Sequence, residues 1–418
     1  MRILHIAPGY YPALGGAETH VRELSERLAL RGHDVTVFTT FPSTGASTDG
    51  VKEFEILNGV KIRRFKSYNG MQTLLRMIWS VPGGYRLLRW LLGPETLRLL
   101  YENPSHPMMV LRTICFKADL TTLIDWSSSI AWEILKAKWM IRYPAIAMPL
   151  FHPEEAWTRS TLFPDMLKAC EYVLVNTAYE KTFVESLDPG RQDVYVVGVG
   201  VDPQKLAPQN GEATRLRYEL GSAPIVGYIG RIALNKGVAN LIRAMQLVWR
   251  EKPSTRLVLA GYKPARESTG VLDVSAVIDS LSEEERAQLV TIYDFAESDK
   301  ESIIDAFDVF AMPSVGESFG IAYLEAWLGR KPVVGSRIGT TACVVENGID
   351  GLLVNPDDID ALARTLLTLL GNPELRRTMG DAGYRKVRSR YTWDVITDEI
   401  EKIYKRIRPA CSLVYASG

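Results

Sequence analysis

Two carboxylates and two cations in this chain have the spacing and surroundings of a site for a phosphorylated ligand. Glu317 and Glu325 stand eight residues apart, in a polar turn that leads into a helix-like segment. Arg231 and Lys236 flank a glycine-bounded turn that follows an apolar run. In α/β proteins, a strand followed by a glycine-containing turn and a helix start is where phosphates bind. Two cations at such a helix start would favour a diphosphate.

The two glutamates could instead be the acid pair of a glycoside hydrolase, whose carboxylates lie roughly 5–9.5 Å apart. Eight residues of helix rise about 12 Å, although Glu317 is expected to precede the helix, so this distance is only a guide. Two acids spread along a turn and a helix suit a long ligand better than a single bond. One would hold sugar hydroxyls and the other ribose hydroxyls, while N–H groups around Phe319 and Gly320 face phosphates. Two solvated helix acids are the alternative, which the Ser318-Phe319-Gly320 turn disfavours.

Two further candidates lie in the N-terminal half of the chain. Gly15 and Gly16 occupy the turn after the first strand, where glycines let the backbone approach a ligand and expose N–H groups. A tight turn at a helix entry would explain them equally well. His152 follows the strand-like run 145–151 and is therefore expected at the carboxyl end of a strand. A structural role for this histidine and a role in binding are left open.

No metal site is predicted. Asp358 and Asp360 match the DxD pattern of some metal-dependent sugar transferases, but they open a helix, where N-capping and first-turn acidity explain them. The four cysteines are far apart and form no CxxC motif, which argues against a zinc site and against a disulfide framework. They are Cys115, Cys170, Cys343 and Cys411.

Length and composition limit the class of protein. The chain has 418 residues, enough for two or three domains, and is 46% hydrophobic and 23% charged, as soluble globular proteins are. Its formal net charge is zero, so no nucleic-acid partner is expected. The N-terminus lacks the pattern of a signal peptide, and no stretch is long and apolar enough to cross a bilayer. We therefore predict a cytoplasmic protein, including the cytoplasmic face of a membrane.

The elements that must position these residues alternate between strands and helices. Residues 3–7, 34–39, 224–230 and 256–261 read as strands, and residues 16–31 and 237–249 as helices with apolar residues at helical spacing. This alternation of strands and helices predicts an α/β fold with parallel sheets covered by helices. We expect two doubly wound domains that face each other across a cleft. The predicted domains are residues 1–200 and 201–390. A helix and tail from 391 to 418 are expected to pack back on the first domain.

Residues 71–100 break this regularity. The segment is rich in Leu and Trp and carries Arg76, Arg86, Arg89 and Arg98 against a single acid, Glu95. Arginines among leucines and tryptophans are typical of helices that lie in a membrane interface. A helical insertion that packs on the protein's own core explains the composition equally well. Both interpretations stay open.

These motifs together resemble retaining glycosyltransferase family 4. Glu317 to Glu325 is similar to that family's E-x7-E motif in its Glu-Ser-Phe-Gly form, and the turns at Gly15-Gly16, Gly230-Arg231 and Lys236-Gly237 resemble its other ligand-binding turns. The resemblance runs along the whole second domain and is weaker between about residues 40 and 125. It implies a GT-B fold with Rossmann-like domains. It also implies transfer of a hexose from a nucleotide-diphosphate sugar to a glycan, lipid-linked or small-molecule acceptor, with retention and without a metal or other cofactor.

The resemblance also implies a role for each site residue. Arg231 and Lys236 would neutralise the leaving diphosphate, as cations aimed at developing charge should. Glu317 would hold the donor sugar and Glu325 the ribose. Ser318 would also belong to the donor-binding loop. The backbone N–H groups of Phe319 and Gly320 would bind the phosphates, and the Gly15-Gly16 turn of the other domain would approach them. His152 would contact the donor sugar near the reacting carbon.

The chain departs from the family at two places. The family commonly has a Gly-Gly turn where this chain has Gly339-Thr340-Thr341, and a Gly where it has Tyr293-Asp294. The first place leaves the identity of the donor open. Two rival functions remain, a nucleotide-sugar epimerase or phosphorylase-like enzyme on the same fold, and a non-catalytic nucleotide-sugar-binding protein.

Overall fold

The computed structural model describes residues 1–13, 15–42, 50–81, 83–204, 210–261, 274–293 and 295–414. The chain forms two compact units, which are described separately here. Unit 1 comprises residues 1–198 and the chain from Ile396 onward, and unit 2 comprises residues 199–395. Both are α/β units with parallel or largely parallel sheets, which confirms the fold class that the alternation of strands and helices predicts.

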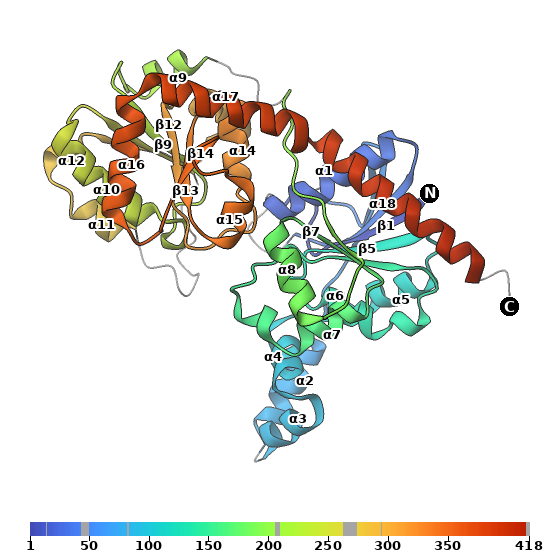
Figure 1. The fold of residues 1–418 in the computed structure, drawn as a ribbon. Helices are drawn as coiled ribbons and strands as arrows, with labels where there is room; N and C mark the ends of the chain where they lie inside the picture. The colour runs from blue at the N-terminus through green and yellow to red at the C-terminus, as the bar shows by residue number, and fades with distance from the viewer. Residues whose placement is uncertain are drawn as a thin grey trace. The chain divides into compact units, whose positions relative to one another are not determined.

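Unit 1 is built on a sheet with the strand order β3-β4-β2-β1-β5-β6-β7-β8 among its described residues (Figure 1). Neighbouring strands are parallel, except for the antiparallel pair of β3 and β4. Every residue of β5 and β6 is buried, as expected for strands with both faces covered. The strands are β1 Arg2–Ile6, β2 Asp34–Thr40, β3 Phe54–Leu57, β4 Val60–Phe65, β5 Leu120–Ile124, β6 Ala145–Met148, β7 Tyr172–Val175 and β8 Val194–Val196.

The helices of unit 1 follow the apolar spacing of the sequence. In α1, Val21, Leu24 and Leu28 are buried on one face, as their helical spacing predicts. The helices are α1 Gly16–Leu30, α2 Gly70–Trp79, α3 Gly84–Leu92, α4 Pro94–Glu102, α5 Pro107–Cys115, α6 Ile130–Lys136, α7 Leu162–Lys168 and α8 Ala178–Leu187, with the 3-10 turns η1 Lys138–Met140 and η2 Ala156–Arg159.

Unit 2 contains a wholly parallel sheet with the strand order β11-β10-β9-β12-β13-β14 in its described part. Its strands are β9 Ile225–Ile229, β10 Arg256–Gly261, β11 Leu289–Tyr293, β12 Val309–Met312, β13 Val333–Ser336 and β14 Gly351–Val354. Its helices are α9 Gly211–Arg217, α10 Val238–Glu251, α11 Ser275–Asp279, α12 Glu283–Arg286, α13 Lys300–Asp305, α14 Ile321–Leu328, α15 Gly339–Val344, α16 Ile359–Gly371 and α17 Pro373–Arg390, with η3 Leu234–Lys236 and η4 Glu297–Asp299.

Each sheet has a point where the strand order reverses direction. In unit 1 the chain moves outward from β1 to β2 and later continues on the other side of β1 with β5. In unit 2 it moves from β9 to β10 and β11 and then returns to the other side of β9 with β12. Ligands of open α/β sheets bind beyond the carboxyl ends of the strands at such a switch point. The loops after β1 and β5, and those after β9 and β12, are therefore where a site is expected.

Helices α2, α3 and α4 form the insertion that residues 71–100 predict. They pack on one another around a small core of Leu75, Leu88, Leu97 and Leu100, and Trp132 of α6 contacts this core. At its base, the backbones of Tyr68 and Ser105 exchange two hydrogen bonds, of 2.9 and 3.0 Å. The apolar residues of the insertion are thus partly buried in a core of their own, and the remainder stay exposed.

The last helix, α18 Trp393–Val414, packs its middle part within unit 1. The Tyr404 hydroxyl lies 2.6 Å from the Thr122 hydroxyl and 3.3 Å from Nε2 of His5, which are both buried in the sheet. Burial, with a smaller contribution from the charge of His20, lowers the pKa of His5 to about 3, so this ring is neutral at pH 7. None of the described helices is long and apolar enough to span a membrane.

Candidate functional site

The loops that follow β9 and β12 contact each other at the switch point of unit 2. The backbone N–H of Val315 donates to the carbonyl of Asn235 at 3.1 Å. The ammonium group of Lys236 lies 2.9 Å from Oε2 of Glu317. Two residues that are 81 positions apart in the sequence thus form one ion pair where a ligand of this fold is expected.

Glycine is required where the two loops meet. Gly237, the N-cap residue just before α10, has φ 73°, a backbone conformation that side chains disfavour. A Cβ atom at Gly237 would lie 1.9 Å from the carbonyl oxygen of Pro313. The glycine therefore allows the loop that carries Lys236 to approach the loop that carries Glu317.

Glu317 is a buried acid held by two contacts. It is 9% exposed, and its ion pair with Lys236 compensates the cost of burying its charge. The hydroxyl of Thr340, the second residue of α15, donates to the backbone carbonyl of Glu317. Thr340 lies in the Gly339-Thr340-Thr341 segment that departs from the family pattern, so the departure adds a contact to the loop. The other departure includes Asp294, which lies outside the described residues, while Tyr293 ends β11.

The start of α14 offers backbone donors rather than side chains. Gly320 caps this helix with φ 85°, and the Phe319 ring is buried against Tyr391, with a centroid distance of 5.5 Å. The N–H groups of Phe319 and Gly320 make no hydrogen bond within the described residues. They extend the unbonded N–H groups of the first turn, which attract anions. Ser318, which precedes them, is half-buried.

Glu325 lies on α14 and forms an ion pair that the sequence analysis missed. Its Oε1 lies 2.6 Å from the ammonium group of Lys300, the first residue of α13. Glu325 is 9% exposed and Lys300 is also largely buried. Each acid of the E-x7-E motif is therefore paired with its own lysine. Arg231, in contrast, is exposed and forms no salt bridge with a described residue, while its carbonyl accepts a 2.6 Å hydrogen bond from Tyr228.

The predicted residues of unit 1 lie at the carboxyl edge of its sheet. Gly15 and Gly16 are exposed at the start of α1, and the carbonyl of Gly15 accepts a hydrogen bond from the N–H of Thr19. The Glu18 carboxylate folds back against this turn, since a Cβ atom on Gly15 would lie 2.2 Å from Oε2 of Glu18. His152 follows β6 and is half-buried. These residues belong to unit 1, whereas Arg231, Lys236 and the E-x7-E loop belong to unit 2.

Asp125 is a further candidate that the sequence analysis missed. It follows β5 at the switch point of unit 1 with φ 59°, in the left-handed region that only a few per cent of non-glycine residues adopt. Its side chain accepts a hydrogen bond from the N–H of Ser127 at 3.0 Å. Burial raises the pKa of its carboxyl, and the nearby charge of Glu18 adds to the increase, while hydrogen bonds with Ser127 oppose it. A left-handed backbone conformation is a feature that only the structure reveals.

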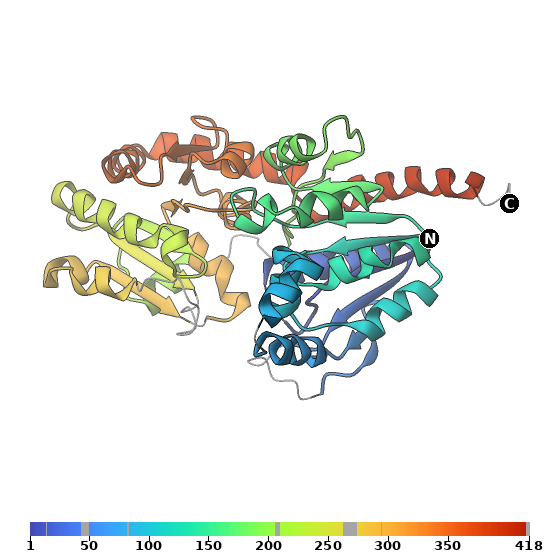
Figure 2. The same cartoon turned by 90° about the horizontal axis from the view of Figure 1, so that it is seen from below.

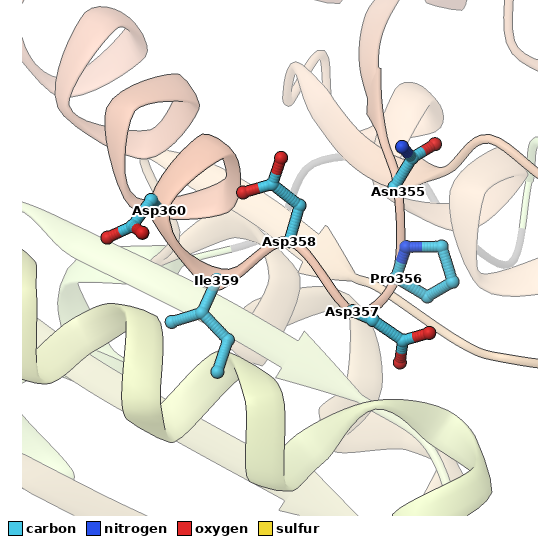
Figure 3. Close-up of a pocket in the computed structure, with 6 residues that line it drawn as sticks. All are labelled: Asn355, Pro356, Asp357, Asp358, Ile359 and Asp360. Atoms are coloured by element: carbon cyan, nitrogen blue, oxygen red, sulfur yellow. The ribbon is translucent and has the colours of Figure 1, made fainter.

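The acidic hollow at residues 355–360 is explained by helix capping. Figure 3 shows Asp358 and Asp360 on either side of Ile359 at the start of α16. The Asp358 carboxylate accepts a 2.8 Å hydrogen bond from the N–H of Ala361, which confirms its predicted role as the N-cap. The described residues contain no group of three or more His, Cys, Asp or Glu side chains that could hold a metal ion.

Two family models match the chain. The model described as "Glycosyl transferases group 1" matches residues 223–372, and the one described as "Glycosyltransferase Family 4" matches residues 14–98. The first match contains Arg231, Lys236, Glu317 and Glu325, and the second contains Gly15 and Gly16.

Curated relatives resemble the chain, two of the three described here along almost its whole length. The D-inositol 3-phosphate glycosyltransferase of Corynebacterium urealyticum is 28% identical over 94% of this chain and 91% of the relative. The glycogen synthase of Mycobacterium tuberculosis is 26% identical over 97% of this chain and 94% of the relative. The alpha-maltose-1-phosphate synthase of Mycolicibacterium smegmatis is 32% identical over 53% of this chain and 58% of the relative.

Solved structures share the fold at low sequence identity. A sucrose-phosphate synthase from Thermosynechococcus elongatus has a TM-score of 0.74 at 19% identity, covering 98% of this chain and all of that chain. The Anabaena protein HepE in complex with UDP and glucose has a TM-score of 0.74 at 18% identity, covering 97% of this chain and all of that chain. These likenesses confirm the predicted GT-B fold, with its two Rossmann-like domains.

Proposed function

We propose that the chain is a family 4 glycosyltransferase, which the two matching family models and the curated relatives support, and that it transfers a hexose from a nucleotide-diphosphate sugar to an acceptor hydroxyl with retention of configuration and without a bound metal. The observation that carries this proposal is the ion pair of Lys236 with Glu317 at the switch point of unit 2. It puts a cation for a diphosphate beside an acid for sugar hydroxyls. Some relatives support the donor class, since HepE has been solved with UDP-glucose.

The leaving diphosphate is assigned to the cationic side of this site. In the proposed reaction the bond between the anomeric carbon and the diphosphate oxygen breaks, and negative charge develops on that oxygen. Arg231 and Lys236 would stabilise this charge, and the unbonded N–H groups of Phe319 and Gly320 would add two donors. Because Arg231 makes no salt bridge among the described residues, no such pair has to break before it binds phosphate.

The donor's hydroxyl groups are assigned to the two acids. Glu317 would accept hydrogen bonds from the sugar and Glu325 from the ribose. Each carboxylate is held by a lysine at 2.9 or 2.6 Å, which fixes its orientation before the donor binds. Gly15, Gly16 and His152 of unit 1 keep the roles that the resemblance predicts. The attacking hydroxyl would pass its proton to the departing phosphate, so no separate general base is assigned.

The acceptor is proposed only as a class. The named relatives are glycosyltransferases or synthases for an inositol phosphate, a glycan and a sugar phosphate. These names support a hydroxyl of a glycan or of a small phosphorylated molecule, and a lipid-linked acceptor stays within the proposal without support from them. The names do not distinguish among these acceptors.

A donor screen followed by a product assay tests the proposal. We expect one of UDP-, GDP- or ADP-glucose to raise the unfolding temperature, because a ligand of the folded state stabilises it. With a suitable acceptor, release of the nucleoside diphosphate should accompany a product that keeps the donor's anomeric configuration, as read by NMR. Conversion of the donor to its epimer without acceptor would support the epimerase alternative. Donor binding without release of diphosphate over a broad acceptor panel would support a binding protein, and inverted product would contradict retention.

A further inference from the structure

Helices α2 and α3 leave an unusually apolar surface exposed. Of the 23 large hydrophobic side chains that are exposed among the described residues, nine lie between Met71 and Leu91. Trp90 is 80% exposed, Met77 64% and Leu91 59%. Large apolar surfaces of this kind mark contact sites rather than ordinary solvent-facing helices. The nine are Met71, Leu74, Met77, Trp79, Val81, Tyr85, Leu87, Trp90 and Leu91.

The same two helices are positively charged. No aspartate or glutamate occurs from Ile56 to Pro94, and α2 and α3 carry Arg76, Arg86 and Arg89. All three arginines are exposed, and none forms a salt bridge within the described part of the chain. Arg76 instead lies over the ring of Tyr101, 5.5 Å from its centroid. The surface therefore combines apolar side chains with cations whose charge is not neutralised by a neighbouring acid.

The geometry of α3 places these two features on its outer side. Leu88 is buried in the small core of the insertion. Arg86 and Trp90 lie one turn apart on the side of the helix opposite Leu88. The exposed Leu87 and Leu91 are also one turn apart, on the flank of the helix. In Figure 1, α3 forms the far end of the insertion, the part most distant from the sheet of unit 1. Figure 2, seen from below, looks at the insertion from this far end. The exposed side of α3 is thus free to meet an extended surface.

We propose that α2 and α3 form a docking surface for a membrane leaflet that contains anionic lipid. Trp90, Leu87 and Leu91 would enter the boundary between headgroups and acyl chains, and Arg76, Arg86 and Arg89 would contact lipid phosphates. Amphipathic helices bind membrane interfaces through this combination of buried apolar area and electrostatic attraction. Charge complementarity selects this occupant, because the surface offers unpaired cations beside apolar side chains and no acids.

A second copy of the chain is a poorer occupant of this surface. In a symmetric dimer the same patch would face itself, which would place arginines opposite arginines. An acidic protein would satisfy the charges, and the experiment below distinguishes it from lipid.

The docking surface is connected through α4 to the loop of unit 1 that contains His152. The carboxylate of Glu95, at the start of α4, accepts hydrogen bonds from the N–H and the hydroxyl of Thr161, at 2.7 and 2.6 Å. Thr161 ends the loop that contains His152. Docking of the insertion would therefore place this loop of unit 1 near the lipid surface. Membrane binding itself does not depend on the proposed transfer reaction.

Vesicle flotation of the full chain tests the proposal. We expect it to float with vesicles of phosphatidylglycerol and phosphatidylcholine, and to stay at the bottom of the gradient with phosphatidylcholine alone. The double variant Arg86→Gln/Arg89→Gln should bind the anionic vesicles about 30-fold more weakly, which is roughly 2 kcal/mol for two cations near the surface. Trp90→Ser/Leu91→Ser should weaken binding by at least tenfold. Added salt should release the wild type.

Matched controls change the same residue types in unit 2. Leu216→Ser removes a leucine that is 82% exposed, and Arg364→Gln/Arg388→Gln removes two exposed arginines. These variants should float like the wild type. All variants should unfold at the wild-type temperature and show the wild-type response to the nucleotide-sugar, so a loss of flotation reports on the surface alone.

Three results would overturn the proposal. The first is a wild type that does not float with anionic vesicles, as expected if the occupant is an acidic protein. The second is flotation that the α3 variants leave unchanged. The third is a concentration-dependent dimer in sedimentation velocity that the α3 variants abolish, which would assign the surface to a second copy.

Discussion

Both units are built on an open α/β sheet, but their ion pairs lie at opposite edges of the sheets. In unit 2, the pairs Lys236–Glu317 and Lys300–Glu325 lie beyond the carboxyl ends of the strands, and all four side chains are less than a fifth exposed. In unit 1, a charged network lies where β2 begins, at the amino end of that strand. The two networks consist of the same kinds of ion pair in different places, so we expect them to have different functions.

The network of unit 1 holds a helix rather than a ligand. Arg31 and His33 precede β2 and contact Glu401 of α18, each at 3.0 Å. Glu401 also pairs with Lys405, whose side chain is 62% exposed. Pairs at this edge of a parallel sheet are far from the ligand-binding edge. Breaking a pair in unit 2 should therefore reduce transfer more than stability, and breaking one in unit 1 should do the reverse.

The largest effect is expected for Lys236→Ala. It removes a cation from the proposed diphosphate site and the partner of the buried Glu317 carboxylate. We expect kcat/KM for transfer to fall about 10²–10³-fold, the range for loss of one group that stabilises developing charge. Steady-state kinetics with the best donor measure this. The exposed Lys402 of α18 provides the control, since Lys402→Ala should leave transfer unchanged. Equal turnover of both variants would remove the basis for the proposed site.

A smaller effect is expected for Lys300→Met, which removes the partner of Glu325. If Glu325 binds the ribose, the variant should raise KM for the donor roughly tenfold while kcat changes little, because ribose contacts are the same in the ground state and the transition state. Lys300→Arg should recover most of the affinity, since it keeps the cation. A fall in kcat without a change in KM would contradict the assignment of Glu325 to the ribose.

In unit 2, the sequence offered the candidate site residues more readily than the contacts that support them. Gly230, Gly237 and the E-x7-E motif could be found because turns and helix starts are local patterns in the sequence. Lys300 and Thr340 could not, since their contacts with Glu325 and with the Glu317 carbonyl depend on how α13 and α15 pack.

The same limit applies to unit 1. The strand and helix rhythm predicted its sheet, but the left-handed conformation of Asp125 has no signature in the sequence. The sequence predicted a helix followed by a tail between residues 391 and 418 without fixing where the helix ends, and α18 continues to Val414. For residues 71–100, composition left two interpretations open, and only the packing of Leu75 and Leu88 separates the buried side from the exposed one.

Thr340→Val tests whether the departure from the family pattern supports the site. The variant keeps the shape of the side chain but removes the hydroxyl that donates to the Glu317 carbonyl. We expect the free energy of unfolding to fall by about 1 kcal/mol, the net value of one hydrogen bond, and kcat/KM to fall by a few fold. Urea unfolding and kinetics measure the two effects. The control is Thr368→Val, which removes an exposed hydroxyl that donates a 2.8 Å hydrogen bond to the carbonyl of Arg364. This variant should change neither the free energy of unfolding nor kcat/KM. Two variants with the same losses would show that Thr340 has no special part in the site.

The smallest effect is expected in the network of unit 1. Although burial raises the pKa of Glu401, hydrogen bonds from Lys405, His33 and Arg31 outweigh it and lower that pKa to about 2, from the usual 4.5. A lowered pKa means that the ionised acid stabilises the fold above about pH 4.5 and that this stability disappears as the pH falls toward 2. Glu401→Gln should therefore lower the free energy of unfolding by at most about 1 kcal/mol at pH 7, because the network is partly exposed. The difference from the wild type should shrink between pH 4.5 and 2 in urea unfolding, and transfer should not change. Glu399→Gln, on the same helix but with an exposed partner, should show a smaller difference at every pH. A Glu401→Gln variant that loses transfer at wild-type stability would contradict the assignment of the unit 1 network to stability and of the unit 2 pairs to transfer.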